Sequence, residues 1–177
     1  MQRPGDLTAR QRMERMIRVD HAGEYGAARI YAGQLAVLGG GGKADLLRHM
    51  QAQEQQHLAT FDGLIADRRV RPTALLPVWH LAGFALGALT AALGETAAMA
   101  CTVAVEEAID AHYSAQIEAL DTTDTALRGT LEQFRAEEIE HRDIGLAHGA
   151  ERAPGFRLLS RIIKAGCRTA IAVSERL

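Results

Sequence analysis

The chain has 177 residues, with 47% apolar and 24% charged side chains and a formal net charge of −2. This length favours one domain, and the composition excludes a disordered chain. Aromatic residues make up only 5%, which disfavours a β-sandwich or barrel. The weakly acidic charge disfavours a nucleic-acid-binding protein. Cys101 and Cys167 are far apart in sequence, so neither a disulfide framework nor a thiolate zinc site is indicated.

Helical periodicity dominates the chain. Inward-facing residues recur at alternating steps of three and four in the segments 13–38, 47–64, 102–120, 127–145 and 156–173. Glycines 39–42 separate the first two segments, and the sequence LDTTD at 120–124 forms a turn whose side chains can cap the next helix. The pattern predicts an all-α bundle in a single domain, residues 1–177, with a last amphipathic helix.

An apolar segment, residues 79–93, lies between the two halves of the pattern. Residues 72–94 carry no Lys, Arg, Asp or Glu, and their length is nominally sufficient to span a bilayer. The segment is rich in Ala and Gly and contains Pro77 and His80, so we expect it not to insert as a transmembrane helix. The N-terminus has no apolar leader, so we expect the mature chain to begin near Met1 and to stay in the cytoplasm.

Four of the periodic stripes are interrupted by a glutamate, and two of these glutamates are followed one turn later by a histidine. The six residues are Glu24, Glu54, His57, Glu106, Glu138 and His141. Each short Glu-x-x-His motif is by itself a weak signal. The spacing of the six residues along the chain makes the signal specific.

The two halves of the chain repeat the same arrangement. Glu24 and Glu54 are 30 residues apart with the glycine turn near their midpoint, and Glu106 and Glu138 are 32 residues apart with LDTTD at their midpoint. In an antiparallel hairpin, residues equidistant from the turn lie at the same height. Each hairpin therefore sets a single Glu opposite a Glu-x-x-His, which is the pattern of a ferritin-like di-metal carboxylate site.

Electrostatics favour the same interpretation. A buried carboxylate without a partner is costly or takes up a proton, and two divalent cations offset four such charges. Oxygen and imidazole ligands suit iron or manganese better than a tetrahedral zinc site. A solvated or salt-bridged set of side chains is the alternative.

Neighbouring carboxylates are separated from the candidate ligands by the faces they occupy. Glu107 shares a mostly polar line with Asp110 and Glu118, and Glu137 lies with Thr130 and Gln133. We therefore expect Glu107 and Glu137 to be solvated, with their neighbours Glu106 and Glu138 facing the bundle axis.

The same periodicity indicates further residues near the site. Asp20 lies one turn before Glu24. It either orients a ligand histidine or is a carboxylate near a helix start that the helix dipole stabilises. Tyr31 is expected to be an ordinary core residue. Tyr113 is a candidate for function, and its neighbour His112 is undecided. The remaining histidines, His21, His49, His80 and His148, lack a ligand partner at helical spacing.

Several segments closely resemble the demethoxyubiquinone hydroxylase family. They are IRVDHAGEYGAARIYAGQLAVL, EQQHLATFDGLI, CTVAVEEAIDAHYSAQI, EEIEHRDIGLAHGAE and IIKAGCRTAIAVSERL. The resemblance covers nearly the whole chain and extends well beyond the candidate ligands. It implies a ferritin-like four-helix bundle with an apolar crossover segment and an extra C-terminal helix.

The resemblance also implies an activity and a ligand set. It implies two iron ions per chain on the same six residues, with Glu54 and Glu138 bridging. The candidate catalytic residues, Tyr113 and its neighbour His112, come instead from the helical periodicity. The expected reaction uses O2 to hydroxylate a polyprenyl methoxy-methyl-benzoquinone in the penultimate step of ubiquinone biosynthesis. No nucleotide-binding fingerprint is present, so an external reductant, NADH directly or through the quinone, is expected.

Further expectations concern partners and alternatives. The resemblance implies peripheral attachment to the membrane that holds the substrate, in a bacterium the cytoplasmic face of the inner membrane, and no nucleic acid is expected as a partner. A homo-oligomer or an accessory protein of ubiquinone biosynthesis is left open. The alternative function is a ferritin-like ferroxidase or iron-storage protein, which uses the same ligand set. A metal-free interaction bundle would leave the inward carboxylates unexplained.

Overall fold

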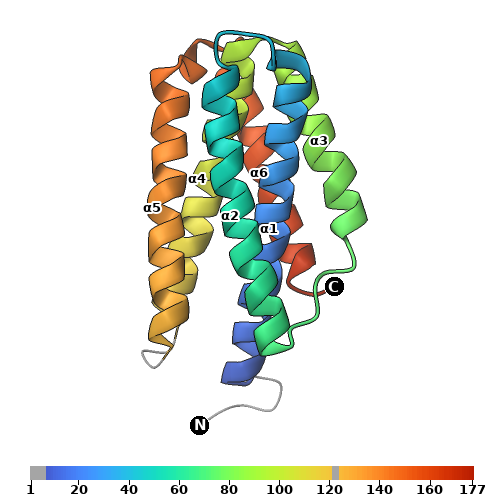
Figure 1. Ribbon diagram of the computed structural model, residues 1–177, viewed down its shortest axis with the longest axis vertical. Coiled ribbons are helices and arrows are strands. Elements are labelled where there is room, and N and C mark those ends of the chain that lie inside the picture. The colour runs from blue at the N-terminus through green and yellow to red at the C-terminus, as the bar shows by residue number, and fades with distance from the viewer. Residues whose placement is uncertain (1–6, 121–123) are drawn as a thin grey trace.

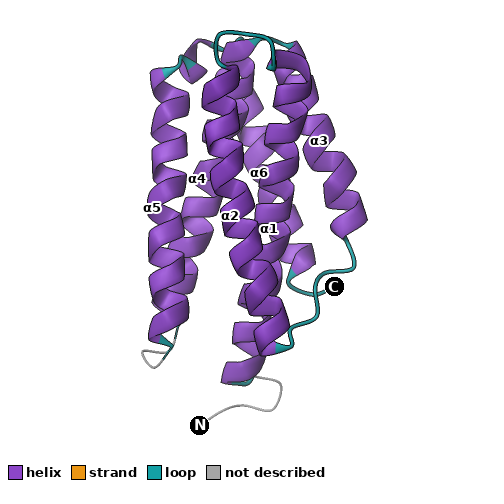
Figure 2. Cartoon of the chain, in the orientation of Figure 1, coloured by secondary structure: helices purple, strands orange, loops and turns teal. Residues whose placement is uncertain are grey.

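The computed structural model describes residues 7–120 and 124–177, which form helices and no strands (Figure 2). The helices are α1 (Ala9–Leu38), α2 (Ala44–Arg68), α3 (Leu76–Ala92), α4 (Glu95–Ala119), α5 (Thr125–Ala147) and α6 (Phe156–Ser174), with a short 3-10 helix at Ala150–Arg152. The prediction of an all-α bundle is confirmed. Residues 121–123 of the expected LDTTD turn lie outside the described residues. Asp124 caps α5, because its side chain accepts a hydrogen bond from the Leu127 amide at 3.2 Å.

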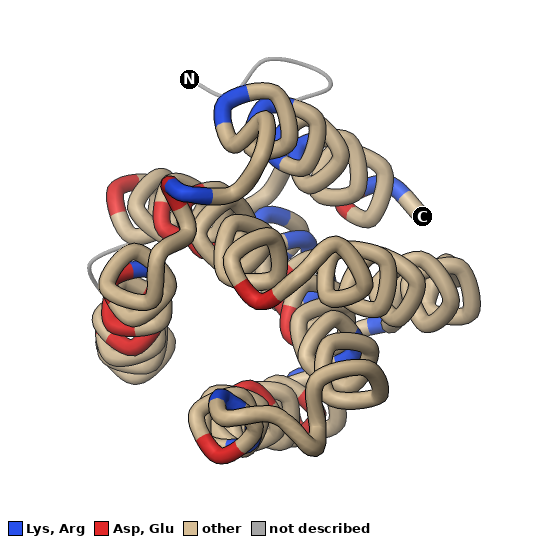
Figure 3. The backbone as a smooth tube through the Cα atoms, turned by 90° about the horizontal axis from the view of Figure 1, so that it is seen from above, with Lys and Arg blue, Asp and Glu red and all other residues tan. Residues whose placement is uncertain are grey.

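Four helices form the bundle as two antiparallel hairpins (Figure 1). Helix α1 packs along α2, and α4 packs along α5. The start of α1 is fixed by a capping box, in which Thr8 and Gln11 satisfy each other's backbone amides. Helix α3 lies against α1, and α6 lies against α4, so both are added outside the four-helix interior. The view from above in Figure 3 shows the charged positions spread over the other helices, whereas α3 carries none.

The bundle interior is divided into layers. One apolar cluster includes Leu47 and Met99, and a second includes Phe61 and Leu131. On each bundle helix, the buried glutamate lies between residues of these two clusters, as Glu24 does between Ile17 and Tyr31 on α1. The helical period therefore places one polar layer, which contains the four glutamates, between two apolar layers.

Helix α3 approaches α1 through glycines. A Cβ on Gly83 would lie 2.8 Å from the Gly26 carbonyl oxygen, and a Cβ on Gly87 would lie 2.8 Å from the Ile30 carbonyl carbon. The two backbones can come this close only because these positions have no side chain. Helix α3 is 17 residues long, and among the described residues no helix combines the length and the apolar character needed to cross a bilayer.

The outer surfaces of α3 and α6 are partly apolar. Leu81 and Leu89 on α3 are 72% and 67% exposed, and Leu158 and Ile162 on α6 are 64% and 62% exposed. Ile163 on α6 is instead buried against the bundle. The apolar residues of α6 are therefore divided between packing on α4 and facing outward.

Candidate metal centre

The six predicted residues come together in the middle of the bundle. Helices α1 and α4 contribute one glutamate each, and α2 and α5 each contribute a glutamate and a histidine. All six side chains are at most 1% exposed: Glu24, Glu54, His57, Glu106, Glu138 and His141. The two Glu-x-x-His pairs place both side chains on one face of a helix, because residues three apart are neighbours on its surface.

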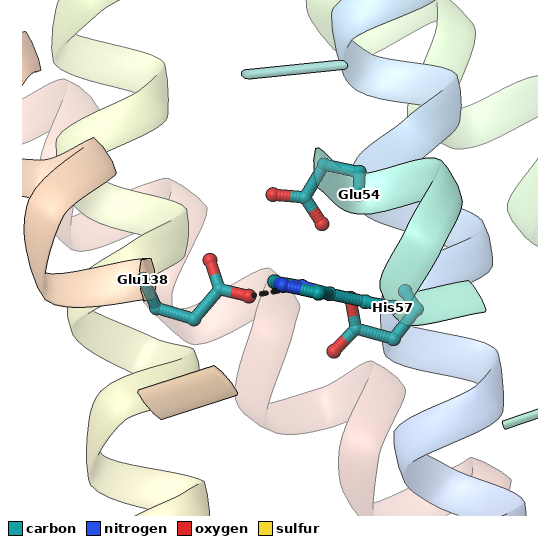
Figure 4. Close-up of side chains that lie close together, drawn as sticks. Glu54, His57 and Glu138 are labelled. Carbon is teal, nitrogen blue, oxygen red and sulfur yellow. Dashed lines mark ion pairs between the residues drawn. The ribbon is translucent and has the colours of Figure 1, made fainter. Parts of the chain in front are cut away.

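The side chains form two groups that share two members. In the first group Glu24 and His57 lie with Glu54 and Glu138, and their candidate ligand atoms are all within 4.8 Å of one another. In the second group Glu106 and His141 lie with the same two glutamates, within the same limit. Figure 4 shows Glu54 and His57 from α2 pointing toward Glu138 from α5. Glu54 and Glu138 thus belong to both groups.

The polar atoms in this layer are poorly satisfied by the protein. Within the described residues, both carboxylate oxygens of Glu54 and of Glu138 lack a hydrogen-bond partner, as do Nδ1 of His57 and Nδ1 of His141. One oxygen of Glu24 and one oxygen of Glu106 also lack a hydrogen-bond partner among these residues. Buried polar atoms are normally paired, and an unpaired set converging on one point is the donor set of a cation site. Carboxylates and imidazoles in this ratio suit iron or manganese.

Proximity and burial strongly perturb the acid–base properties of the site. Burial raises the pKa of Glu54 and of Glu106 well above the usual range, and the charge of Glu138 adds to the effect. Burial opposes the charged form of His57, yet the nearby carboxylates of Glu138 and Glu24 raise its pKa to about 12. Burial also opposes ionisation of Glu138, but His141 and His57 lower its pKa to about 2. The layer therefore holds protons that a divalent cation would displace.

Each histidine is held through its outer ring nitrogen. Nε2 of His57 lies 2.5 Å from Oε2 of Glu137, and Nε2 of His141 lies 3.0 Å from Oε1 of Gln53. The expectation that Glu137 is solvated was therefore wrong: it is turned away from the bundle axis, but toward a histidine of the opposite hairpin. Gln53 was not predicted. Both residues directly precede the glutamate of a Glu-x-x-His motif, which is a signal that the sequence contains.

Two tyrosines hold the single glutamates. The Tyr31 hydroxyl donates a hydrogen bond to Oε1 of Glu106 at 2.9 Å, and the Tyr113 hydroxyl donates one to Oε1 of Glu24. The interpretation of Tyr31 as an ordinary core residue was incomplete, because it is buried in the core and also contacts the site. Each tyrosine crosses between the two hairpins, from α1 to α4 and from α4 to α1.

Asp20 and His112 lie beside the site rather than in it. Oδ1 of Asp20 accepts a hydrogen bond from Gln116 at 2.8 Å and lies 3.2 Å from Nε2 of His112. Neither alternative considered for Asp20 holds: its partners are Gln116 and His112 rather than His57 or His141, and α1 begins at Ala9, so Asp20 is not in the first turn. Burial raises its pKa to about 6, although hydrogen bonding to His112 opposes the change.

The other polar residues considered in the sequence have separate contacts. Glu107 pairs with Lys164 of α6 and is only partly exposed. His21 lies 2.9 Å from Asp62, and His80 lies 2.7 Å from the Tyr25 hydroxyl. These residues are outside the two ligand groups.

A groove runs along the outer side of α1 and α4, the two helices that carry Glu24 and Glu106. Its cavity volume is about 360 Å³, and it is lined almost entirely by apolar side chains from α1, α3, α4 and α6. The lining includes Trp79 and Leu86 on α3 and Val105 and Ile109 on α4. An apolar molecule can thus approach the two helices that hold the single glutamates.

The fold and this centre define a class of protein: a helical bundle with a buried carboxylate–histidine site that can hold metal. The sequence profile of the family described as ubiquinone biosynthesis protein COQ7 matches residues 11–174. The chain belongs to this family.

Curated relatives agree with this assignment. The chain is 60% identical over 175 residues to a protein of Rhodospirillum rubrum named 3-demethoxyubiquinol 3-hydroxylase, covering 98% of this chain and 82% of that protein. It is 54% identical over 176 residues to the human mitochondrial protein named NADPH-dependent 3-demethoxyubiquinone 3-hydroxylase, covering 97% and 81%. It is 41% identical over 182 residues to the mitochondrial 5-demethoxyubiquinone hydroxylase of Saccharomyces cerevisiae, covering 93% and 78%.

Proposed function

We propose that this chain hydroxylates the ring of a polyprenyl methoxy-methyl-benzoquinone, a demethoxylated precursor, in ubiquinone biosynthesis. The observation that carries the proposal is the pair of buried Glu/His groups sharing Glu54 and Glu138, in a chain of the COQ7 family. The names of relatives that are 41 to 60% identical over most of the chain support the same reaction.

The cofactor in this proposal is a pair of iron ions. Two divalent ions bring four positive charges to a layer with four buried glutamates, so the charges balance. Bound iron would supply the reductive activation of O2 that places one oxygen atom on the ring. Glu54 and Glu138 belong to both groups, so we assign them as the bridging ligands. The remaining four ligands divide evenly, one glutamate and one histidine to each ion.

The protein's own residues fix the geometry of the centre. The Tyr31 hydroxyl donates to one oxygen of Glu106, and the Tyr113 hydroxyl donates to one oxygen of Glu24. The second oxygen of each glutamate has no hydrogen-bond partner among the described residues and would face an ion. The apolar layers above and below exclude bulk water, and exclusion of water protects a reactive centre from side reactions. Tyr113 is therefore a positioning residue in this proposal, whereas His112 contacts Asp20 and Gln116 and none of the six ligands.

The apolar groove supports a polyprenyl quinone as the substrate. Its lining matches a hydrophobic ring and chain, and it includes Leu86 of α3 and the exposed Ile162 of α6. A polyprenyl quinone is nearly insoluble in water, so it must reach the protein from a bilayer. The groove would then be the entrance, with residues of the apolar segment 79–93, such as Trp79 and Leu86, on one of its sides.

We extend the proposal to peripheral binding at the surface of the membrane that holds the quinone, in a bacterium the cytoplasmic face of the inner membrane. The exposed apolar side chains Leu158 and Ile162 lie on the same helix as four basic residues, Arg157, Arg161, Lys164 and Arg168. An apolar strip beside cations is the pattern of a helix lying at a lipid interface. Lys164 is already paired with Glu107, so the three arginines carry most of the attraction.

A liposome experiment tests the membrane part. Wild-type protein should sediment with liposomes that contain anionic lipid, and replacing Arg157, Arg161 and Arg168 by Gln should weaken this binding without changing the metal content. Lys164→Gln is the matched control, because its charge is already neutralised by Glu107. Equal sedimentation of wild type and the triple variant at low salt would refute the electrostatic contribution. Absence of wild-type binding to any liposome would refute the membrane proposal as a whole.

Turnover tests the activity itself. Iron-loaded protein, a demethoxylated quinone in detergent, NADH as external reductant and ¹⁸O2 should give a product that contains one ¹⁸O atom, measured by mass spectrometry. Repeating the assay with NADPH tests the reductant named for the human relative. The Glu54→Ala variant should be inactive. Rapid oxidation of added Fe²⁺ without oxygen transfer to the ring would refute the proposal and support the ferroxidase alternative.

A further inference from the structure

Each histidine of the centre has a partner at its outer ring nitrogen, which we call its clamp, and the two clamps differ in charge. Helix α2 holds His57 but supplies Gln53 to His141, and α5 holds His141 but supplies Glu137 to His57. Each clamp therefore crosses from one hairpin to the other. The arrangement is a repeat in geometry, but it is not a repeat in charge, because one clamp is a carboxylate and the other is an amide.

The carboxylate clamp fixes the tautomer of its histidine. An ionised carboxylate can only accept, so Nε2 of His57 must carry the hydrogen that fills the 2.5 Å contact with Glu137. When a metal ion displaces the proton from Nδ1, the lone pair is therefore on that atom, which lies 3.1 Å from Oε1 of Glu138 and 3.3 Å from Oε2 of Glu24, within the ligand layer. Gln53 can accept through Oε1 in the same way, but its amide can also turn and present its NH2 group to His141.

Packing adds to the difference between the two histidines. The ring of His57 stacks on the buried ring of Phe134, with centroids 4.0 Å apart and planes 24° apart. The ring of His141 instead meets Tyr31 edge to face, with centroids 6.0 Å apart. His57 is thus held by a stacked ring and a carboxylate, whereas His141 is held by a neutral amide and a more distant ring.

We propose that Glu137 and Gln53 are positioning residues that make the two metal positions chemically unequal. The negative charge on Glu137 makes the His57 imidazole the stronger donor, because a carboxylate partner raises the basicity of a ligating ring. The ion on the Glu24–His57 side is then bound more tightly and is harder to reduce than the ion on the Glu106–His141 side. This inference rests on the proposed metal centre, but it does not depend on which substrate is hydroxylated.

Metal binding can be measured without turnover. Titration of the metal-depleted protein with Co²⁺, followed by its d–d absorption, should resolve a tighter and a weaker ion. Glu137→Gln should weaken the tighter ion about 10- to 100-fold and leave the other unchanged. Gln53→Glu should tighten the weaker ion. The exposed residues Glu140 and Gln55 on the same two helices provide the controls Glu140→Gln and Gln55→Glu.

Two spectroscopic measurements separate positioning from simple support of the fold. In the Co²⁺ protein the paramagnetically shifted ring N–H signal of His57 should exchange rapidly with solvent in Glu137→Ala, while that of His141 stays protected; Gln53→Ala should do the reverse. In the iron protein the midpoint potential should become more positive in Glu137→Gln and more negative in Gln53→Glu.

The outcomes decide the inference. Equal weakening of both ions in Glu137→Gln, or potentials in Glu137→Gln and Gln53→Glu that match those of the control variants, would overturn it. If wild-type protein binds no Co²⁺, both the centre and the clamps are wrong. If the Co²⁺ pattern is as expected but no quinone is hydroxylated, the inference stands and only the proposed function fails.

Discussion

The contact between α3 and α1 makes a sharp prediction, because two known effects of Gly87→Ala have opposite signs. In an exposed helix, replacing Gly by Ala stabilises by about 1 kcal/mol through backbone entropy. At Gly87 the added Cβ would overlap the Ile30 carbonyl oxygen and lie 2.8 Å from its carbon and 3.0 Å from the Gln34 nitrogen. These are backbone atoms, so no change of rotamer can relieve the overlap.

The steric effect should win. Ordinary contacts begin near 3.4 Å, so α3 must move away from α1 by more than about 0.6 Å along its central contact. Overpacking of this kind costs about 3 kcal/mol at the upper end of its range. Subtracting the gain of about 1 kcal/mol in propensity leaves a net loss of about 2 kcal/mol. For a chain of this size that corresponds to a fall in Tm of about 4 to 8 °C.

Chemical and thermal unfolding of matched variants would measure this balance. Gly63→Ala on α2 is the control, because the position is exposed and a Cβ there has nothing within 4 Å. We expect Gly63→Ala to raise the free energy of unfolding by about 1 kcal/mol and Gly87→Ala to lower it. Equal or greater stability of Gly87→Ala relative to wild type would refute the close approach of the two helices.

Three further predictions concern the site. Glu54→Ala or Glu138→Ala should lose most of the bound iron in elemental analysis, because each removes a ligand shared by both ions; full occupancy would contradict the bridging assignment. Glu106→Gln should abolish hydroxylation while Glu107→Gln keeps it, since Glu107 contributes only a partly exposed ion pair of about 0 to 1 kcal/mol; the reverse would show that the helix register is wrong. Burial raises the pKa of Asp20 from 3.8 to about 6, so the folded state binds this proton more tightly than the unfolded chain, and stability is lost as pH rises from about 4 to 6. Asparagine does not titrate, so the free energy of unfolding of Asp20→Asn, measured in urea, should rise relative to that of wild type by up to about 3 kcal/mol across this pH window. A difference between the two proteins that stays constant from pH 4 to 7 would contradict the raised pKa.

Most of the ligand layer could be predicted from the sequence because it depends on local geometry. The helical period decides which of two adjacent glutamates faces the axis, and it separates Glu106 from Glu107 without any knowledge of the neighbours. The distance of each residue from its turn decides which residues of a hairpin share a height. Both rules act within a single hairpin, such as the one from Ala9 to Arg68. The two hairpins follow the same rules, so their glutamates and histidines are predicted to lie in one layer.

The clamps could not be predicted in the same way. A residue next to an inward glutamate points about 100° away from it, and the sequence does not say whether that direction ends in water or on another helix. For Glu137 the direction ends on His57, because side chains of α2 and α5 meet across the bundle interior. The same reasoning applies to Tyr31, whose hydroxyl reaches Glu106 on another hairpin.

The sequence by itself determined the all-α class, the two Glu-x-x-His hairpins and the inward set of six residues, because helix periodicity and turn positions are local properties of the chain. Only the tertiary structure decided how the hairpins meet, and with that the carboxylate on one histidine and the amide on the other. It also decided the position of α3: Gly83 and Gly87 lie one turn apart, but only the packed structure shows that they permit a backbone contact with α1. These features depend on the distances between helices, and such distances arise from the packing of the whole bundle.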